Sequence, residues 1–170
     1  MKSLHLLRHA KSSWATPGVD DHDRDLNGRG ERDAARMGVA LAARLAPQSI
    51  HASSALRAQR TLSGLCSTWP SLSAHAHITD GALYTFSWED VLAWLQDQSA
   101  DEDSLFLIGH NPAFTELCNQ LVARPALDNL PTAGYLRFSI DIDCWSDITE
   151  GIASLDAWLF PRDLPDHRTP

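Results

Sequence analysis

Two segments of this chain place imidazole and guanidinium side chains directly after short apolar runs. Arg8 and His9 end the leucine run that opens LLRHAKSSW at residues 6–14, and His110 follows the apolar start of LIGHNP. A neutral imidazole can act as a nucleophile or carry a proton, and a guanidinium binds phosphate through two parallel hydrogen bonds. The two segments therefore predict an anion site, provided that the fold brings them together.

A third basic residue, Arg57, lies in SSALRAQRTL and again follows a short apolar stretch. Ser53 or Ser54 is predicted to cap a helix, which places Arg57 in its first turn. The helix dipole disfavours a cation there by about 0.3–1 kcal/mol, and an anion bound between the first-turn N–H groups and the guanidinium would offset this cost. The alternative interpretation is an exposed arginine whose small cost the protein tolerates.

His110 precedes a helix start, because Asn111 is a good cap and Pro112 suits a first helical position. A histidine next to the positive end of a helix stays neutral unless an anion is present. Taken alone, it could equally be a core histidine bonded to a neighbouring loop. Two arginines and two histidines at three predicted strand ends favour a shared anion pocket over three separate structural roles.

Missing motifs narrow the chemistry of this pocket. The sequence contains no GxxxxGK[ST], HExxH, GxSxG or Cys-x5-Arg segment, which disfavours a Walker phosphate loop, a zinc protease, a serine hydrolase elbow and a cysteine phosphatase. A histidine nucleophile remains. It would attack phosphorus while the arginines neutralise the phosphoryl oxygens, and water would then split the phosphoenzyme. This scheme needs no metal or other cofactor.

The elements that must position these residues alternate between short apolar runs and longer amphipathic segments, which predicts an α/β layer fold. Residues 1–160 are expected to form one domain, followed by a flexible tail at 161–170. Strands are predicted at 4–7, 49–53, 105–108, 135–142 and 152–160, and helices between Asn27 and Pro47, between Ser54 and Trp69, at 88–95 and at 112–122.

Composition bounds the partners of this domain. Its 14 basic and 22 acidic residues give a net charge of −8, which argues against nucleic acid or an anionic membrane surface as a partner. Cys66, Cys118 and Cys144 are widely spaced and suggest neither disulfides nor a zinc site. No apolar run approaches the roughly 18 residues needed to span a bilayer. We expect a cytoplasmic monomer.

The segment DDHDRD at residues 20–25 invites interpretation as a calcium loop, with alternate aspartates as ligands. The match fails because Leu26 occupies the position that requires glycine and Arg32 the position of the bidentate glutamate. We expect a solvated acidic loop near the mouth of the pocket.

Together, LLRHAKSSW, SSALRAQRTL and LIGHNP resemble the histidine phosphatase superfamily, with its phosphoglycerate mutase-like fold, and within it the small SixA-type phosphohistidine phosphatases. RDLNGRG at residues 24–30 resembles the loop that leads into the first long helix of this family, so the likeness extends to about Phe160. It implies a three-layer α/β sandwich with a central, mainly parallel sheet flanked by helices.

The resemblance also implies roles for the site residues. His9 would be the nucleophile that becomes phosphorylated. Arg8, Arg57 and His110 would bind and polarise the phosphoryl group, assisted by the backbone N–H of Asn111. The usual Arg-His-Gly of the superfamily reads Arg-His-Ala here, a familiar variant in the SixA-like group.

One expected residue is missing. In the mutases and broad phosphatases of the family, a glutamate after the RAxxT arginine protonates the leaving oxygen, and DGALYT at residues 80–85 holds none. Asp80 and Glu89 are the nearby candidates. Loss of a general acid should slow hydrolysis of an alkyl phosphate by a factor on the order of 10² to 10⁴. A phosphoramidate suffers less, because its imidazole can leave already protonated.

The sequence therefore favours a phosphorylated protein partner, such as a histidine phosphotransfer domain, over a small phosphate ester. One alternative is a small-molecule phosphomonoesterase that uses Asp80 or Glu89 as its acid. A second is a phosphate-binding or interaction module that has kept the fold without the activity.

Overall fold

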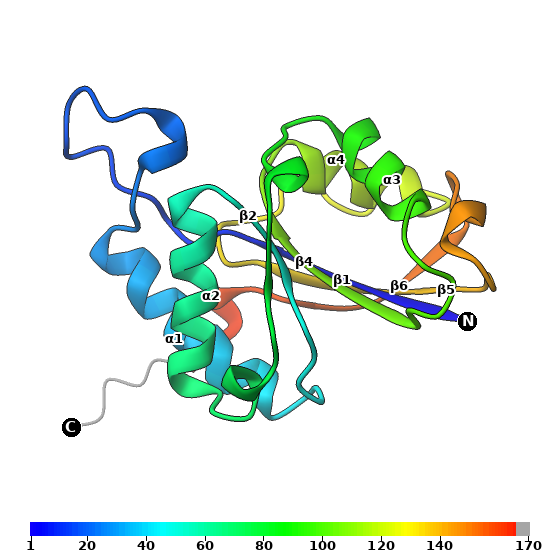
Figure 1. Cartoon of the computed structure of the whole chain (residues 1–170), viewed down its shortest axis with the longest axis horizontal. Coiled ribbons are helices and arrows are strands. Elements are labelled where there is room, and N and C mark those ends of the chain that lie inside the picture. The colour runs from blue at the N-terminus through cyan, green and yellow to red at the C-terminus, as the bar shows by residue number, and fades with distance from the viewer. Residues whose placement is uncertain (166–170) are drawn as a thin grey trace.

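The structure is a computed structural model and describes residues 1–165. A six-stranded sheet in the order β3-β2-β4-β1-β5-β6 lies between two pairs of helices (Figure 1). The strands are β1 (Lys2–Arg8), β2 (His51–Ser53), β3 (Ile78–Asp80), β4 (Ser104–Gly109), β5 (Tyr135–Ile140) and β6 (Ala153–Leu159), and the helices are α1 (Gly28–Ala42), α2 (Leu56–Thr68), α3 (Trp88–Gln96) and α4 (Ala113–Leu121).

The sheet is mainly parallel, as predicted. β1 pairs with β4, β4 with β2 and β2 with β3 in parallel, whereas β5 pairs antiparallel with both β1 and β6. In this register Arg8 at the end of β1 lies opposite Gly109 at the end of β4, and Ala52 near the end of β2 lies opposite Ile108. The carboxyl ends of the three central strands therefore meet at one edge.

Alternate residues of the central strands fill the two halves of the core. On β4, Leu105 and Leu107 pack in the cluster that includes α3 and α4, whereas Phe106 and Ile108 pack in the cluster that includes α1 and α2. Figure 1 shows these helix pairs on opposite faces of the sheet. Because both faces are covered, leucine and other apolar residues make up most of the buried part of β1 and β4, which explains why short apolar runs predicted these two strands.

The predicted N-terminal cap of α1 is confirmed: the Asn27 side chain accepts a hydrogen bond from the N–H of Gly30 at 2.9 Å. The predicted cap of α2 is wrong. Ala55 is the capping residue and makes no side-chain cap bond. The Ser53 hydroxyl bonds to His110 and accepts from the N–H of Ala55 at 3.3 Å, and the Ser54 hydroxyl bonds to His22, so neither serine caps the first turn of α2.

α4 begins one residue later than predicted, with Pro112 at its cap position. The Asn111 side chain still serves the helix start, because its Oδ1 accepts from the N–H and the hydroxyl of Thr115 at 3.2 and 3.0 Å. None of the helices within residues 1–165 is long and apolar enough to cross a membrane.

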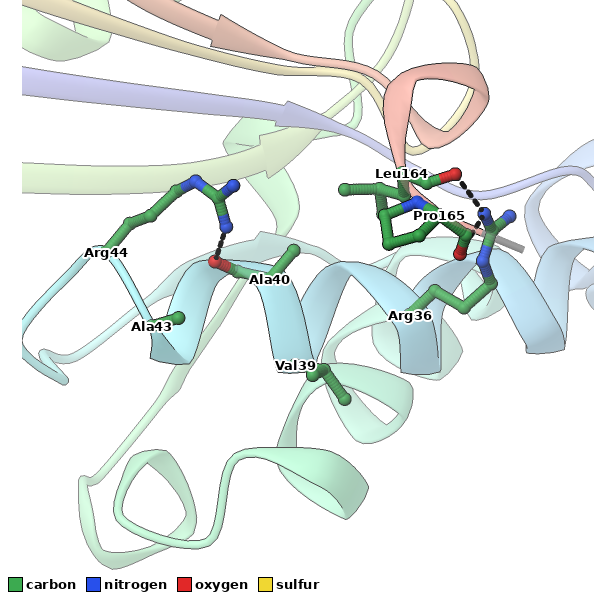
Figure 2. Close-up of a pocket in the computed structure, with 7 residues that line it drawn as sticks. All are labelled: Arg36, Val39, Ala40, Ala43, Arg44, Leu164 and Pro165. Carbon is green, nitrogen blue, oxygen red and sulfur yellow. Dashed lines mark hydrogen bonds between the residues drawn. The ribbon is translucent and has the colours of Figure 1, made fainter. Parts of the chain in front are cut away.

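The start of the expected C-terminal tail lies against α1. Pro161–Asp163 form a short 3₁₀ helix, and the Arg36 guanidinium donates to the carbonyl groups of Leu164 and Pro165 at 3.0 and 3.3 Å (Figure 2). The small pocket between α1 and this segment is lined by none of the predicted site residues. Residues 166–170 of the expected tail lie outside the described residues.

Candidate active site

The four residues predicted to bind and attack a phosphoryl group meet at the carboxyl edge of the sheet. Arg8 ends β1 and His9 follows it, His110 follows β4, and Arg57 is the second residue of α2. The rings of His9 and His110 lie 5.2 Å apart between centroids. Arg57, only 2% exposed, donates from Nε to Nε2 of His9 and contacts Nδ1 of His110 through Nη2, both at 3.3 Å.

The hydrogen bonds of His9 define its tautomer. Its Nδ1 lies 2.7 Å from the carbonyl oxygen of Ala10, which can only accept, so Nδ1 carries the ring proton. Nε2 therefore keeps its lone pair and faces Arg57. Burial, together with the positive charges of Arg57 and Arg8, lowers the pKa of His9 to about 3. The ring is neutral near pH 7 and ready to act as a nucleophile.

One hydroxyl ties the loop after β1 to α2. The N–H of Ala10 donates to Oγ1 of Thr61 at 2.9 Å, and this hydroxyl donates to the carbonyl of Arg57 at 2.7 Å. Ala10 and Thr61 are both fully buried. The alanine that replaces the usual glycine of the family therefore lies inside the core, and the position of His9 is coupled to that of Arg57.

Both ring nitrogens of His110 are bonded in this structure. Nδ1 accepts from Arg57, so Nε2 carries the proton and donates to the Ser53 hydroxyl at 2.7 Å. Burial and the neighbouring His9 and Arg57 lower the pKa of His110 to about 3. His110 can thus orient a phosphoryl group as a neutral ring.

Two aromatic rings stand beside His110. Those of Tyr84 and Phe86 approach it edge-on, with centroids 5.5 and 5.6 Å from that of His110. Phe86 is 47% exposed, so this aromatic wall reaches the surface.

Arg8 is the less constrained of the two guanidinium groups. Its Nη1 donates to the carbonyl of Leu130 at 2.8 Å, whereas its Nε is buried without a hydrogen-bond partner among the described residues. Burial and the charge of Arg57 lower the pKa of Arg8. A buried donor without an acceptor costs about 1–3 kcal/mol, which an anion bound beside it would recover.

Asn111 holds the neighbouring loop. Its amide nitrogen donates to Oδ1 of Asn129 at 3.1 Å and to the carbonyl of Leu130 at 3.0 Å. The contact of its backbone N–H with a phosphoryl group stays a prediction.

The two acidic candidates from the sequence are bonded elsewhere. Asp80 accepts from the N–H of Ala82 at 2.9 Å and from the indole N–H of Trp94 at 2.8 Å. Glu89, in the first turn of α3, accepts from the hydroxyl of Ser87 at 2.7 Å. Within the described chain neither carboxylate hydrogen-bonds to a histidine or arginine of the site.

The carboxylate that does reach the site is Asp21, from the loop expected to be solvated. Its Oδ2 accepts from Nη2 of Arg57 at 3.0 Å and from the hydroxyl of Tyr84 at 2.6 Å, and its Oδ1 accepts from Arg24 at 2.8 Å. The carbonyl oxygen of Asp21 also accepts from Nη1 of Arg57 at 2.6 Å.

Burial acts to raise the pKa of Asp21, but the hydrogen bonds from Tyr84, Arg24 and Arg57 outweigh it and hold that pKa well below the usual range of a carboxyl. Asp21 is therefore ionised. Sequence reasoning missed it because spacing alone does not distinguish it from Asp20 or the other aspartates of DDHDRD.

The assembled groups fit transfer of a phosphoryl group to His9. Nε2 of His9 lies beside the Arg57 guanidinium, and the charge of Arg8 also acts on this ring, so both arginines can neutralise phosphoryl oxygens there while His110 supplies a second imidazole. Among residues 1–165 no group of three or more histidine, cysteine, aspartate or glutamate side chains is arranged to hold a metal ion.

Known sequences resemble this chain over much of its length. A sequence profile of the histidine phosphatase superfamily (branch 1) matches residues 4–82 of this chain. A Mycobacterium tuberculosis protein of uncharacterised function is 30% identical over 166 residues, which span 92% of this chain and 100% of that protein.

Solved structures match nearly the whole chain. The SixA protein of Agrobacterium tumefaciens has a TM-score of 0.77 at 25% identity, covering 94% of this chain and 98% of its own. A protein histidine phosphatase SixA in complex with tungstate has a TM-score of 0.74 at 19% identity, with 94% and 97% covered. A mycobacterial glucosyl-3-phosphoglycerate phosphatase has a TM-score of 0.68 at 16% identity, with 93% and 98% covered. These likenesses confirm the expected α/β fold.

Proposed function

This chain belongs to the histidine phosphatase superfamily, and we propose that the phosphatase removes the phosphoryl group of phosphohistidine in a partner protein. One observation carries the choice of substrate. The only carboxylate bonded to the site within the described residues, Asp21, is held ionised, so the resting site presents no neutral carboxylic acid to a leaving alcohol.

The proposed reaction has two steps. Nε2 of His9 attacks phosphorus, and the bond between phosphorus and the substrate imidazole breaks with its electron pair returning to that ring. Water then attacks the phosphorylated His9, and the electron pair of the broken bond returns to Nε2 as phosphate departs. Arg8 and Arg57 neutralise the phosphoryl oxygens in both steps, and His110 orients the group.

The leaving group decides how much an acid is needed. An alkyl phosphate must expel an alkoxide unless a proton is supplied, and general acid catalysis is worth a factor of about 10² to 10⁴ there. A phosphohistidine ring protonated at its free nitrogen leaves as neutral imidazole without help. Asp80 is bonded to Trp94 of α3, and Glu89 is bonded to Ser87 at the start of that helix. Because neither carboxylate is bonded to the site, the geometry supports the phosphoramidate better than the ester.

The relatives support each candidate by name only. The SixA likeness supports a protein phosphohistidine substrate, such as a histidine phosphotransfer domain. The likeness to a glucosyl-3-phosphoglycerate phosphatase supports the alternative, a small phosphate ester.

The test uses chemical stability of the intermediate. The protein is incubated with a ³²P-labelled phosphohistidine peptide and, separately, with a labelled sugar phosphate, in excess chelator, and quenched in alkali, which spares phosphohistidine. We expect label on the wild-type protein, none on His9→Ala, and faster turnover of the peptide.

His75→Ala, which removes a histidine outside the site, serves as the control and should label normally. Label that survives in His9→Ala would contradict the nucleophile. Faster turnover of the sugar phosphate would favour the esterase, and the absence of turnover for both would favour an idle phosphate-binding module.

A further inference from the structure

The Asp21 carboxylate shares Arg57 with the expected phosphoryl position. Arg57 directs Nε at His9 and Nη2 at both His110 and Asp21, while its Nη1 is bonded to the Asp21 carbonyl. Every donor nitrogen of this guanidinium is therefore in use. A phosphoryl group bound between His9 and His110 would meet the Nε and Nη2 edge of this guanidinium, and there it would compete with the Asp21 carboxylate for Nη2.

Two contacts keep Asp21 at the site when a phosphoryl group displaces it from Arg57. The Tyr84 hydroxyl donates to Oδ2 at 2.6 Å, and Arg24 donates to Oδ1 through Nη2 at 2.8 Å and through Nε at 3.2 Å. Neither contact depends on Arg57. The side chain of Asp21 is 43% exposed, so the carboxylate is accessible from solvent.

The same region offers a surface for a flat ring. Tyr84, which holds Asp21, packs edge-on against His110 and against Phe86, with centroid separations of 5.5 and 5.7 Å. Beside the phosphoryl position the protein thus places a negative charge and an aromatic wall. A flat, cationic leaving group complements both features.

We propose that Asp21 determines leaving-group specificity by pairing, as a carboxylate, with the cationic imidazolium ring of the bound phosphohistidine. The inference rests on the proposed function. The N–H of the substrate ring donates to Asp21, which favours the protonated ring. When His9 attacks, the electron pair of the breaking phosphorus–nitrogen bond neutralises that cation, so neutral imidazole leaves rather than an imidazolate anion.

The same charge acts against other substrates. A sugar phosphate brings an uncharged or anionic leaving group, which gains nothing from the carboxylate while its phosphoryl group still has to displace Asp21 from Arg57. A general acid would give a proton to the leaving group. Asp21 cannot do this, because it is a carboxylate, and it instead favours a substrate whose leaving group is already protonated.

The experiment compares Asp21→Asn with wild type on a phosphohistidine peptide and on p-nitrophenyl phosphate, whose leaving group needs no proton. Asparagine keeps the shape and an acceptor for Tyr84 but removes the charge. We expect kcat/KM for the peptide to fall at least tenfold more than kcat/KM for the aryl phosphate, because only the peptide loses a charge-assisted hydrogen bond to its leaving group. Inorganic phosphate should bind several-fold more tightly because its competitor is gone.

The pH profile provides a readout that a structural role would not move. Arg24, Arg57 and Tyr84 face Asp21 directly, and His110 lies beyond Arg57. Asp21 keeps the substrate ring protonated to higher pH, so the alkaline limb for the peptide should shift to lower pH in Asp21→Asn. Asp23→Asn is the matched control, because its carboxylate is bonded to the neighbouring His22 and, among residues 1–165, to none of Arg8, His9, Arg57 and His110.

The outcomes separate the two proposals. Equal losses on both substrates, with an unchanged alkaline limb, would overturn the role of Asp21 and leave the proposed function standing. Absence of phosphohistidine turnover by the wild-type protein would overturn the proposed function and this inference with it.

Discussion

At the residue scale, Thr61 joins the loop after β1 to α2. Its hydroxyl accepts from the N–H of Ala10 and donates to the carbonyl of Arg57, so one buried oxygen links the loop that carries His9 to the helix that carries Arg57. Ala10 and Thr61 are both fully buried, so without the Thr61 hydroxyl the N–H of Ala10 would lose its acceptor inside the core, which costs free energy.

We expect Thr61→Val, which is nearly isosteric, to lower the free energy of unfolding by about 1–3 kcal/mol. It should also lower kcat, since the His9 loop loses its anchor. Urea unfolding and steady-state kinetics measure the two effects. Ser63→Ala, on the exposed side of α2, is the control and should change neither. An unchanged midpoint in Thr61→Val would contradict the anchoring role.

At the scale of elements, the start of α1 packs against the loop that follows β1 and carries His9. Gly30, in the first turn of α1, lies against the backbone of Lys11, two residues after His9, so that a Cβ on Gly30 would collide with the Lys11 carbonyl. The same carbonyl accepts from the N–H of Asn27 at 2.9 Å. The start of α1 thus fixes the path of the loop.

Gly30→Ala should therefore destabilise the protein and displace the His9 loop, although alanine is the better helix former. Gly28→Ala provides a matched comparison, because a Cβ at that position meets only the tip of the Arg32 side chain at 3.4 Å. We expect a lower melting temperature and reduced phosphoenzyme formation for Gly30→Ala, and no loss for Gly28→Ala. Equal behaviour of the two variants would contradict the close contact.

For the molecule as a whole, three buried histidines link stability to pH. Burial lowers the pKa of His5 to about 4 and the pKa of His9 and His110 to about 3, from an ordinary value near 6.5. Below pH 6.5 the unfolded chain binds protons at these rings while the folded protein does not. Stability is therefore highest above pH 6.5 and falls as the pH decreases toward 4, by up to about 1.4 kcal/mol per pH unit for each ring.

Urea unfolding at pH 7.5 and pH 5.0 measures this loss. His110→Gln should lose less stability between the two values than wild type, because one such ring is removed. His75→Gln should behave like wild type, since its histidine is not among the three buried rings. A wild-type midpoint that does not change between the two pH values would contradict the expected linkage.

Several parts of the fold followed from local patterns. The strands before His9 and His110 are buried on both faces, so their buried residues are mostly apolar, and the Asn27 cap marks the start of α1. β3 escaped prediction, because Ile78–Asp80 is a short, exposed edge strand whose structure depends on pairing with β2. The pattern of apolar residues does not predict such a strand, because its conformation depends on hydrogen bonds to the neighbouring strand.

The sequence by itself determined which residue types stand at the ends of the central strands, because burial favours apolar residues within the strands and charged residues where the apolar runs stop. Arg8, His9, Arg57 and His110 could be named on that basis. Only the tertiary structure decided which carboxylate joins them. Asp21 meets Arg57 and Tyr84 from 36 and 63 residues away, and bonds over such separations depend on how the chain is folded rather than on any local pattern.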